Sequence, residues 1–320
     1  MKTTNQQPEP GNNTLNTSAL QDAISLRPPR TLWGDVWRQF RKHRLAMFGS
    51  VVILAALLFT LAGPFVYQVS PRKINFGISM APPSLEVPFG ADDMGHDMLA
   101  RAMWGGRISI AVGVAAMLLS ITIGTTIGAI SGFFGGMTDS LLMRFTDLCI
   151  ALPRLPLLLM IIFLFRDPVR ALVGPEAGIF ILIVSLIGIL GWMTTARVVR
   201  ASFLSIKNKE FVEAAISVGA RKRRLIIQHI LPNVMSPIIV SATIGVAGAI
   251  LTESSLSFLG LGFPPDVPTW GRMLYDGRNY LDLAPHMAII PGTLIFLVVL
   301  SINFMGDGLR DALDPRHRGR

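Results

Sequence analysis

The chain has 320 residues, of which 51% are hydrophobic and only 15% are charged. This composition leaves too little polar surface to cover a soluble domain of that length, so it excludes an ordinary water-soluble enzyme and indicates a protein of the lipid bilayer. The formal net charge of +9 lies mainly in two blocks, residues 27–44 and 197–224, and both blocks flank apolar segments. That placement favours a role in membrane orientation over nucleic-acid binding.

The chain begins with a polar tail. Residues 1–30 are rich in Asn, Gln, Thr and Pro and show no periodicity, which predicts disorder and not a signal peptide. Residues 32–44 then place Trp33, Trp37 and Phe40 on one helical face, away from the basic side chains. We expect an N-terminal interfacial helix on the inner leaflet, with an early start of the first span as the alternative.

The first long apolar run covers residues 45–67 and holds 23 uncharged residues. Because about 20 helical residues cross a bilayer core of roughly 30 Å, this run is long enough to span it. Five further segments qualify, at about residues 108–134, 147–165, 179–196, 233–252 and 285–305. The sequence therefore predicts an all-α integral membrane protein with six transmembrane helices and a transmembrane core over 108–306.

Two of these spans carry local features. Pro153 and Pro156 interrupt the third, which we expect to be a kinked span because neighbouring helices can satisfy the freed carbonyl groups. Gly124, Gly128 and Gly132 recur every four residues in the second span. This spacing predicts a helix-packing face that another helix approaches closely; the alternative is that glycine is simply frequent in membrane helices.

The distribution of Lys and Arg predicts the topology. Seven basic residues precede the first span, and residues 197–232 hold eight against two acids, so both segments are expected in the cytoplasm. The segments 68–107, 166–178 and 253–284 balance basic with acidic residues, as expected of outer loops. Six crossings then place both termini in the cytoplasm, the second as a tail over 307–320.

The cytoplasmic segment between the fourth and fifth spans has a helical pattern of its own. Phe211, Ala214, Ala215 and Val218 recur at helical spacing, which predicts a short helix with an apolar face of mostly small residues. Gly219 stands where a left-handed helix end is expected. Small residues keep such a ridge thin, as insertion into a partner's groove requires.

A second, basic helix is predicted over residues 221–230. Pro232 follows it, and we expect a break in the helix there that marks re-entry into the membrane. The whole segment thus reads as a helix-turn-helix that protrudes on the cytoplasmic side.

This segment resembles the coupling motif of the membrane subunits of ABC importers. The pattern is Glu-Ala-Ala, three residues, Gly, nine residues and then a hydrophobic-x-Leu-Pro ending. The matching positions in this sequence are Glu213, Ala214, Ala215, Gly219, Leu231 and Pro232. His229 stands where the general motif has Ile, and a HILPN-like ending is similar to that of the peptide branch.

Three other stretches resemble the C-type permease subunits of dipeptide, oligopeptide and nickel importers. They are PFGADDMGHDMLARAMWGGRISI at residues 88–110, SFLGLGFPPDVPTWGRML at 257–274 and NFMGDGLRDALDPR at 303–316. With the coupling motif, the resemblance covers about residues 32–316.

The resemblance implies the fold of a type I ABC importer permease, which forms half of a translocation channel for di- or oligopeptides. It implies as partners a second homologous permease, two ATPases that bind ATP and Mg²⁺, and an extracytoplasmic substrate-binding protein. The importer is then expected in a bacterial inner membrane. The chain has no G-x-x-x-x-G-K-[ST] phosphate loop, so we expect no ATPase site, cofactor or enzymatic activity of its own. Import of nickel chelates or of another small solute is the alternative, and a proton-coupled secondary transporter is a rival class.

Two charged residues are candidates for the translocation pathway. Arg154 lies about two turns into the third span, where an arginine is costly unless it snorkels, pairs or faces water. Asp147, seven residues earlier, allows a structural ion pair; the alternative is a pathway charge for an anionic substrate group. Glu253, at the outer end of the fifth span, is expected to line the vestibule or to mark the interface.

Other polar residues give weaker signals. Asp92, Asp93 and Asp97 are interpreted as helix-capping or solvated loop acids, with ligand binding as the alternative. The five histidines lie far apart without the spacing of metal ligands, so we predict no metal site. Cys149 is the single cysteine, so no disulfide can form within the chain.

Overall fold

The computed structural model describes residues 32–313, and this part of the chain is helical with one isolated β-bridge between Ala91 and Asp97. The polar tail of residues 1–30 lies outside the described range. The elements in chain order are α2 (Leu32–Lys42), α3 (Arg44–Leu61), α4 (Gly63–Val66), η1 (Phe76–Ile78), α5 (Met98–Phe134), α6 (Gly136–Ala151), α7 (Arg154–Val173), α8 (Pro175–Ile189), α9 (Trp192–Ile206), α10 (Glu210–Ser217), α11 (Lys222–Arg224), the π-helix η2 (Leu225–Ile230), α12 (Leu231–Phe258), α13 (Trp270–Gly277) and α14 (His286–Leu313).

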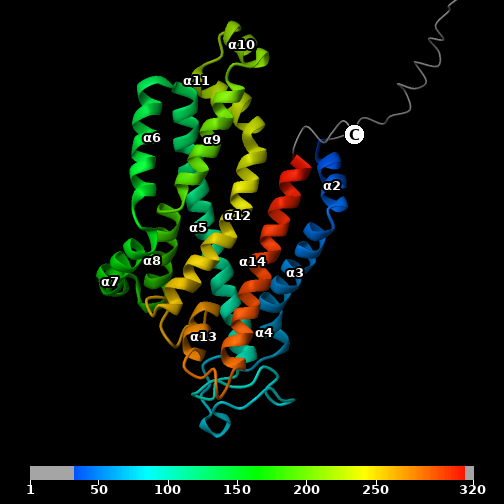
Figure 1. Cartoon of the computed structure of the whole chain (residues 1–320), viewed down its shortest axis with the longest axis vertical. Coiled ribbons are helices and arrows are strands. Elements are labelled where there is room, and N and C mark those ends of the chain that lie inside the picture. The colour runs from blue at the N-terminus through cyan, green and yellow to red at the C-terminus, as the bar shows by residue number, and fades with distance from the viewer. Residues whose placement is uncertain (1–31, 314–320) are drawn as a thin grey trace, which may run out of the picture.

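The long helices run side by side along the length of the molecule (Figure 1). Five continuous helical segments within residues 32–313 are long and apolar enough to cross a bilayer: Arg44–Val66, Met98–Phe134, Pro175–Ile206, Lys222–Phe258 and His286–Leu313. Helices α6 and α7 meet at an angle of 81° and make a sixth crossing if they count as one span. The all-helical membrane fold predicted from the sequence is thereby confirmed.

The predicted boundaries of the third span, residues 147–165, are wrong. Helix α6 begins at Gly136 and ends at Ala151, and the chain bends sharply before α7 starts at Arg154. Helix α6 contains three charged residues, Asp139, Arg144 and Asp147, and they lower its hydropathy, so its first part was not recognised as membrane-spanning. Two of these charges are paired with arginines of α9: Asp147 with Arg197 and Asp139 with Arg200. An ion pair lets a charged residue lie within a membrane bundle, which hydropathy alone cannot show.

Other boundaries also shift. Helix α5 begins at Met98, capped by the Asp97 carboxylate, so the predicted loop of 68–107 ends ten residues earlier. Arg107 is accommodated in this helix because its guanidinium donates to the Thr60 and Leu61 carbonyls at 2.7 and 2.8 Å. The fourth span likewise runs over Pro175–Ile206, with a short break near Gly191, and so extends into the predicted segment of 197–232.

The two ends of the described chain pack together. Phe40 and Val36 of α2 are buried against Ala312 and Leu313 of α14, while Trp37 remains 57% exposed. The predicted N-terminal helix therefore forms, but its buried face covers α14. Helix α14 continues to Leu313 and so includes residues 307–313 of the predicted tail; the boundary of that tail at 307 stays a prediction.

Helix α5 is the centre of the bundle and packs closely on α9. A Cβ atom on Gly124, Gly128 or Gly132 would lie 2.5–2.8 Å from carbonyl oxygens of α9. Contacts at that distance exclude any side chain, so these glycines allow the two backbones to touch. Nearer its N-terminus, around Val112 and Ala116, α5 also packs on α8 and α12.

Substituting a glycine of this contact should destabilise the protein. A methyl carbon at Gly128 would lie 2.5 Å from the Ala196 carbonyl oxygen, so we expect Gly128→Ala to lower the free energy of unfolding by about 1–3 kcal/mol. Gly248→Ala is the matched control, because a Cβ at Gly248 meets no atom within 4 Å and alanine favours a helix. Thermal unfolding of the two purified variants in detergent measures the difference, and equal melting temperatures would contradict the close packing.

Candidate functional site

Helix α10 forms a ridge at the end of the molecule opposite α13 (Figure 1). Gly219 follows the ridge with a φ of +82°. Two hydrogen bonds close the helix: Gly219 N donates to the Ile216 carbonyl at 2.9 Å and Ala220 N to the Ala215 carbonyl at 3.0 Å. This is the Schellman ending, which needs a left-handed residue. The predicted left-handed conformation of Gly219 is confirmed.

The ridge has a buried and an exposed side. Val212 is only 1% exposed and packs in a cluster that includes Phe203 of α9 and Leu225 of η2. The opposite side exposes large apolar side chains, namely Phe211, Ile216 and Val218. The ridge is thus held rigidly on α9 and α12 while it presents apolar surface outward.

The residues of the Glu-Ala-Ala pattern divide between these two sides. Glu213 and Ala214 are exposed on the ridge, whereas Ala215 is half-buried beneath it. Leu231 is half-buried and Pro232 is exposed in the first turn of α12. The pattern therefore brings exposed and supporting residues together at one end of the bundle.

The predicted helix break at Pro232 is wrong. The chain is helical without interruption from Lys222 to Phe258, and the segment Leu225–Ile230 just before the proline is a π-helix. A proline clashes with the carbonyl one turn earlier in a regular α-helix, and a wider π turn is a known way to relieve such strain. The side-chain amide of Asn233 also donates to the His229 carbonyl at 2.7 Å.

Three cavities lie along the bundle, and neighbouring ones share lining residues; together we call them the groove. The first, about 430 Å³, lies near the α10 end between α9, α12 and α14. The second, about 380 Å³, lies at mid-length between α5, α8, α9 and α12, and shares Val198 and Ser241 with the first. The third, about 340 Å³ and almost wholly apolar, shares Met117 with the second. A groove that leads from one end to the middle of a membrane bundle, with polar side chains in its first two cavities, is the shape expected of half a channel.

Arg154 lines the middle cavity of this groove. The expected ion pair with Asp147 does not form, because the Asp147 carboxylate accepts a hydrogen bond from Arg197 of α9 at 2.5 Å. Nor does Asp147 lie near an inner helix end, as its predicted span implied. It is eleven residues (147 − 136) from the start of α6, or about 16 Å along the helix.

Glu253 does not line a vestibule in this structure. Its side chain is fully buried, and its carboxylate is surrounded by four hydroxyl groups. The shortest hydrogen bonds come from Ser257 at 2.8 Å and Thr269 at 2.9 Å, and longer ones come from Ser109 and Ser254. Because these hydroxyls belong to α5, α12 and the start of α13, Glu253 ties three elements together.

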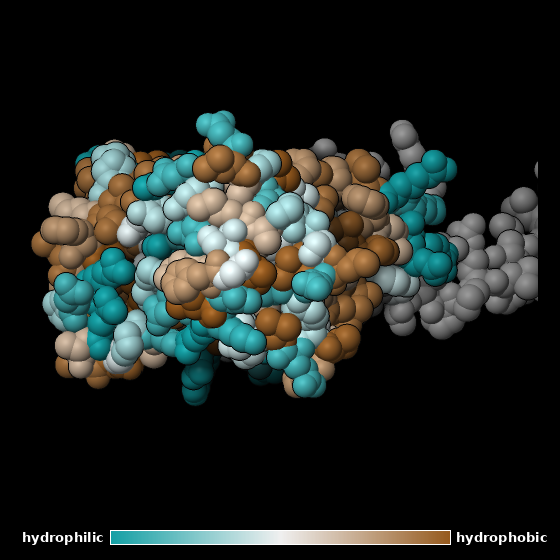
Figure 2. All heavy atoms as spheres, turned by 90° about the horizontal axis from the view of Figure 1, so that it is seen from below, coloured by the Kyte–Doolittle hydropathy of each residue, from teal (hydrophilic) through white to brown (hydrophobic). Residues whose placement is uncertain are grey.

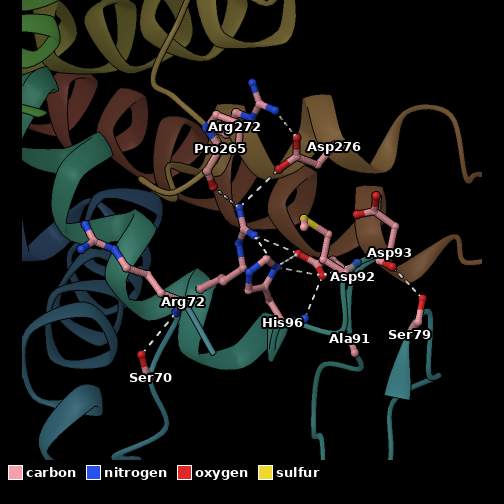
Figure 3. Close-up of polar contacts among 12 residues, drawn as sticks. Ser70, Arg72, Ser79, Ala91, Asp92, Asp93, His96, Pro265, Arg272 and Asp276 are labelled. Atoms are coloured by element: carbon pink, nitrogen blue, oxygen red, sulfur yellow. Dashed lines mark hydrogen bonds and ion pairs between the residues drawn. The ribbon is translucent and has the colours of Figure 1, made fainter. Parts of the chain in front are cut away.

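A second polar cluster fixes the α13 end. The Arg101 guanidinium of α5 donates to Asp92 at 2.8 Å and to Asp276 of α13 at 3.3 Å. His96 lies 2.8 Å from the same Asp92 carboxylate, and Arg272 pairs with Asp276 at 2.8 Å (Figure 3). Burial raises the pKa of the Asp276 carboxyl, although Arg272 and Arg101 oppose that shift.

The sequence interpretation of the nearby acids was right for one residue and wrong for another. Asp97 caps α5, as expected, by accepting a hydrogen bond from Ala100 N at 2.8 Å. Asp92, in contrast, is a buried member of the cluster and not a solvated loop acid. Sequence patterns could not find this cluster, since Arg101 and Asp276 are 175 residues apart. Seen from the α13 end, hydrophilic and apolar side chains are interspersed over the surface (Figure 2).

A bundle of apolar helices with a lateral groove and a ridge at one end is typical of the membrane component of a transporter. Residues 124–319 match the family described as binding-protein-dependent transport system inner membrane component. Residues 31–83 match the N-terminal TM domain of oligopeptide transport permease C. The chain belongs to the family of binding-protein-dependent transport system inner membrane components.

Similar proteins agree with this assignment. The chain is 39% identical over 291 residues to the oligopeptide transport system permease protein OppC of Haemophilus influenzae, covering 90% of each chain. It is 41% identical over 288 residues to the protein of the same name from Bacillus subtilis, covering 90% of this chain and 91% of that one. It is 35% identical to the glutathione transport system permease protein GsiD of Shigella boydii over 94% of this chain and 97% of that one.

A solved structure shows the same fold. A chain of the MetNI methionine ABC transporter, in an inward-facing conformation, aligns with a TM-score of 0.50 at 17% identity. The alignment covers 66% of this chain and 94% of the other. The fold is therefore that of a type I ABC importer permease.

The contact between Tyr67 and Asp97 gives a testable pH dependence. The Tyr67 hydroxyl donates to the Asp97 carboxylate at 2.6 Å, and burial together with this contact raises the Tyr67 pKa to about 12. A raised pKa in the folded state means that the stabilisation is complete below the ordinary tyrosine pKa of about 10 and is lost as the pH rises through about 12.

The difference in phenolate absorbance between wild type and Tyr67→Phe isolates this residue among the three tyrosines. We expect the difference signal to titrate near pH 12 and the variant to lose less stability than wild type between pH 10 and 12. A midpoint near pH 10 would show that the Tyr67 contact with Asp97 is absent in the protein.

Proposed function

We propose that this chain is the membrane-spanning subunit of an ATP-driven importer of peptides and forms half of its translocation channel. The observation that carries the proposal is the groove that opens at the α10 end and reaches the middle of the bundle, beside the ridge. The names of the similar permeases support peptides as the substrate class, and one of those names adds glutathione.

The ridge is proposed to couple the channel to ATP hydrolysis. Phe211, Ile216 and Val218 expose apolar surface that a groove on a partner ATPase would cover. Fully burying one such side chain contributes about 1.5–3 kcal/mol, so covering these three favours the contact with a partner. Glu213 and Ala214 lie within this contact surface, while Ala215, Gly219, Leu231 and Pro232 support it.

The helices beneath the ridge would transmit the movement. Val212 and Leu225 connect the ridge to a core that contains Phe203 of α9 and Val234 of α12. Both helices also line the middle cavity. A displacement of the ridge therefore acts directly on the walls of the groove, so ATP binding by the partners and the orientation of the channel become linked equilibria.

The remaining partners follow from the same proposal. A second homologous permease would supply the other half of the channel, two ATPases would bind ATP and Mg²⁺, and a substrate-binding protein would deliver the peptide. The importer would reside in a bacterial inner membrane, with the α10 end and both termini in the cytoplasm. The excess of basic residues around the ridge supports this orientation, and four of them are exposed in sequence, from Arg221 to Arg224.

Substitutions at Gly219 test the coupling role. A Cβ at Gly219 meets no atom within 4 Å, but its φ of +82° is strained for any β-branched residue. We expect Gly219→Val to deform the end of the ridge and to reduce receptor-stimulated ATP hydrolysis by at least tenfold. Gly219→Asn should retain most of the activity, because Asn tolerates the left-handed region.

The assay uses the chain reconstituted in liposomes with its paired permease, both ATPases and the loaded substrate-binding protein. Wild-type complex should hydrolyse ATP and accumulate peptide, and neither activity should appear with the isolated chain. Uptake by the isolated chain driven by a proton gradient would contradict the proposed function. Full coupling in Gly219→Val would remove the ridge from the mechanism while leaving the permease assignment intact.

Thiol labelling tests the orientation. In a Cys149→Ser background, a cysteine in place of the exposed Asn208 should react with an impermeant reagent only after the membrane is permeabilised. A cysteine in place of the exposed Asp266 should react in intact spheroplasts. The reverse pattern would invert the proposed topology.

A further inference from the structure

We infer that Arg154 recognises a carboxylate of the substrate as it passes through the middle cavity, and that it gives the channel a preference for peptides with a free carboxyl group. The inference rests on the proposed function and concerns the same groove. Arg154 is the first residue of α7, directly after the 81° bend between α6 and α7. This position brings the side chain to the wall of the cavity between α5, α9 and α12.

The cavity is positively charged. Arg154 is the one charged residue among those that line it, and no carboxylate of the described residues lies within 4 Å of its guanidinium. Asp147, the acid closest in sequence within the bundle, is engaged by Arg197. Arg310 lines the adjoining cavity, so one guanidinium group lies in each of the first two cavities of the groove.

An arginine without a counter-ion is costly inside a membrane bundle. Insertion into a membrane helix costs about 2.5–3.5 kcal/mol for a central arginine that lacks compensation. Elsewhere in α6 and α9 the structure neutralises such charges in pairs, Asp139 with Arg200 and Asp147 with Arg197. Arg154 differs from these residues because it lines a cavity and has no carboxylate within reach among the described residues.

Hydroxyl groups complete the site. Most hydroxyls of these helices donate to a carbonyl four residues earlier, as those of Thr122 and Thr243 do. Those of Ser120, Thr194 and Ser241 line the cavity and make no hydrogen bond within residues 32–313. They are free to donate to oxygen atoms of a ligand.

The chemistry of these groups selects a carboxylate. A guanidinium donates two parallel N–H···O bonds to a carboxylate, and nearby hydroxyls satisfy the remaining lone pairs. A peptide brings such a group at its C-terminus or in an acidic side chain. A cation finds no carboxylate among the side chains that line this cavity, and Arg154 repels it.

Transport of matched peptides tests the inference. The complete importer is reconstituted, and the substrate-binding protein is loaded beforehand with one peptide that has either a free or an amidated C-terminus. Preloading at saturation removes the receptor's own preference from the comparison. A second pair, with a Glu or a Lys side chain and an amidated C-terminus, distinguishes a terminal from a side-chain carboxylate.

We expect Arg154→Gln to slow uptake of the carboxylate-bearing member of a pair about tenfold and to change uptake of its partner less than twofold. Arg154→Lys keeps the positive charge but lacks the two parallel N–H donors of a guanidinium. We therefore expect an intermediate ratio between the uptake rates of the two members of a pair. Arg144→Gln is the control, because Arg144 is exposed on α6 and is not among the residues that line the three cavities.

Equal loss for both members of a pair in Arg154→Gln would overturn the inference and assign Arg154 to structure or to a contact with the second permease. An unchanged ratio in both variants would overturn it as well. If Arg154→Gln does not assemble, the ratio in Arg154→Lys decides. The proposed function is judged separately by ATP-driven uptake in the wild-type complex, which does not depend on this ratio.

Discussion

The direct contact between the backbones of α5 and α9 is the constraint on which the rest of the structure depends. It exists because Gly124, Gly128 and Gly132 present no side chain where the carbonyls of α9 approach. With these two helices fixed, α12 packs on both and α8 closes on α5. The middle cavity lies between α5, α8, α9 and α12, and only residues 207–209 separate the end of α9 from the ridge at α10. Channel wall and ridge are thus parts of one rigid unit.

Several charges inside the bundle are compensated by a partner. Acids and arginines of α6 and α9 neutralise each other, and at the α13 end Arg101 is held between Asp92 and Asp276. Glu253 has no basic partner but receives hydrogen bonds from four hydroxyls. Each arrangement lowers the cost of a buried charge. Arg154, in contrast, lines the middle cavity and has no carboxylate partner among the described residues, which supports the inference that a ligand binds it.

The two ends of the molecule are built differently. At the α13 end, the polar contacts of Glu253 and Arg101 lock loops and short helices to α5 and α12. At the α10 end, apolar packing beneath Val212 holds the ridge, whose outer side chains remain uncovered. Hydrogen-bonded charges need specific geometry and resist displacement, whereas an apolar surface can be covered and released by a moving partner. This contrast fits an importer in which ATP hydrolysis acts at one end.

The sequence by itself determined the features that depend on neighbouring residues. Apolar length predicted the membrane bundle, the Gly219 position predicted a left-handed helix end, and the Glu-Ala-Ala pattern predicted the ridge. Only the tertiary structure decided where α6 begins, that the helix continues through Pro232, that Glu253 is buried and that Asp147 pairs with Arg197 in place of Arg154. The physical reason is that hydropathy and backbone conformation are set locally, whereas the cost of a charge or a proline is set by the groups that the fold brings beside it from distant parts of the chain.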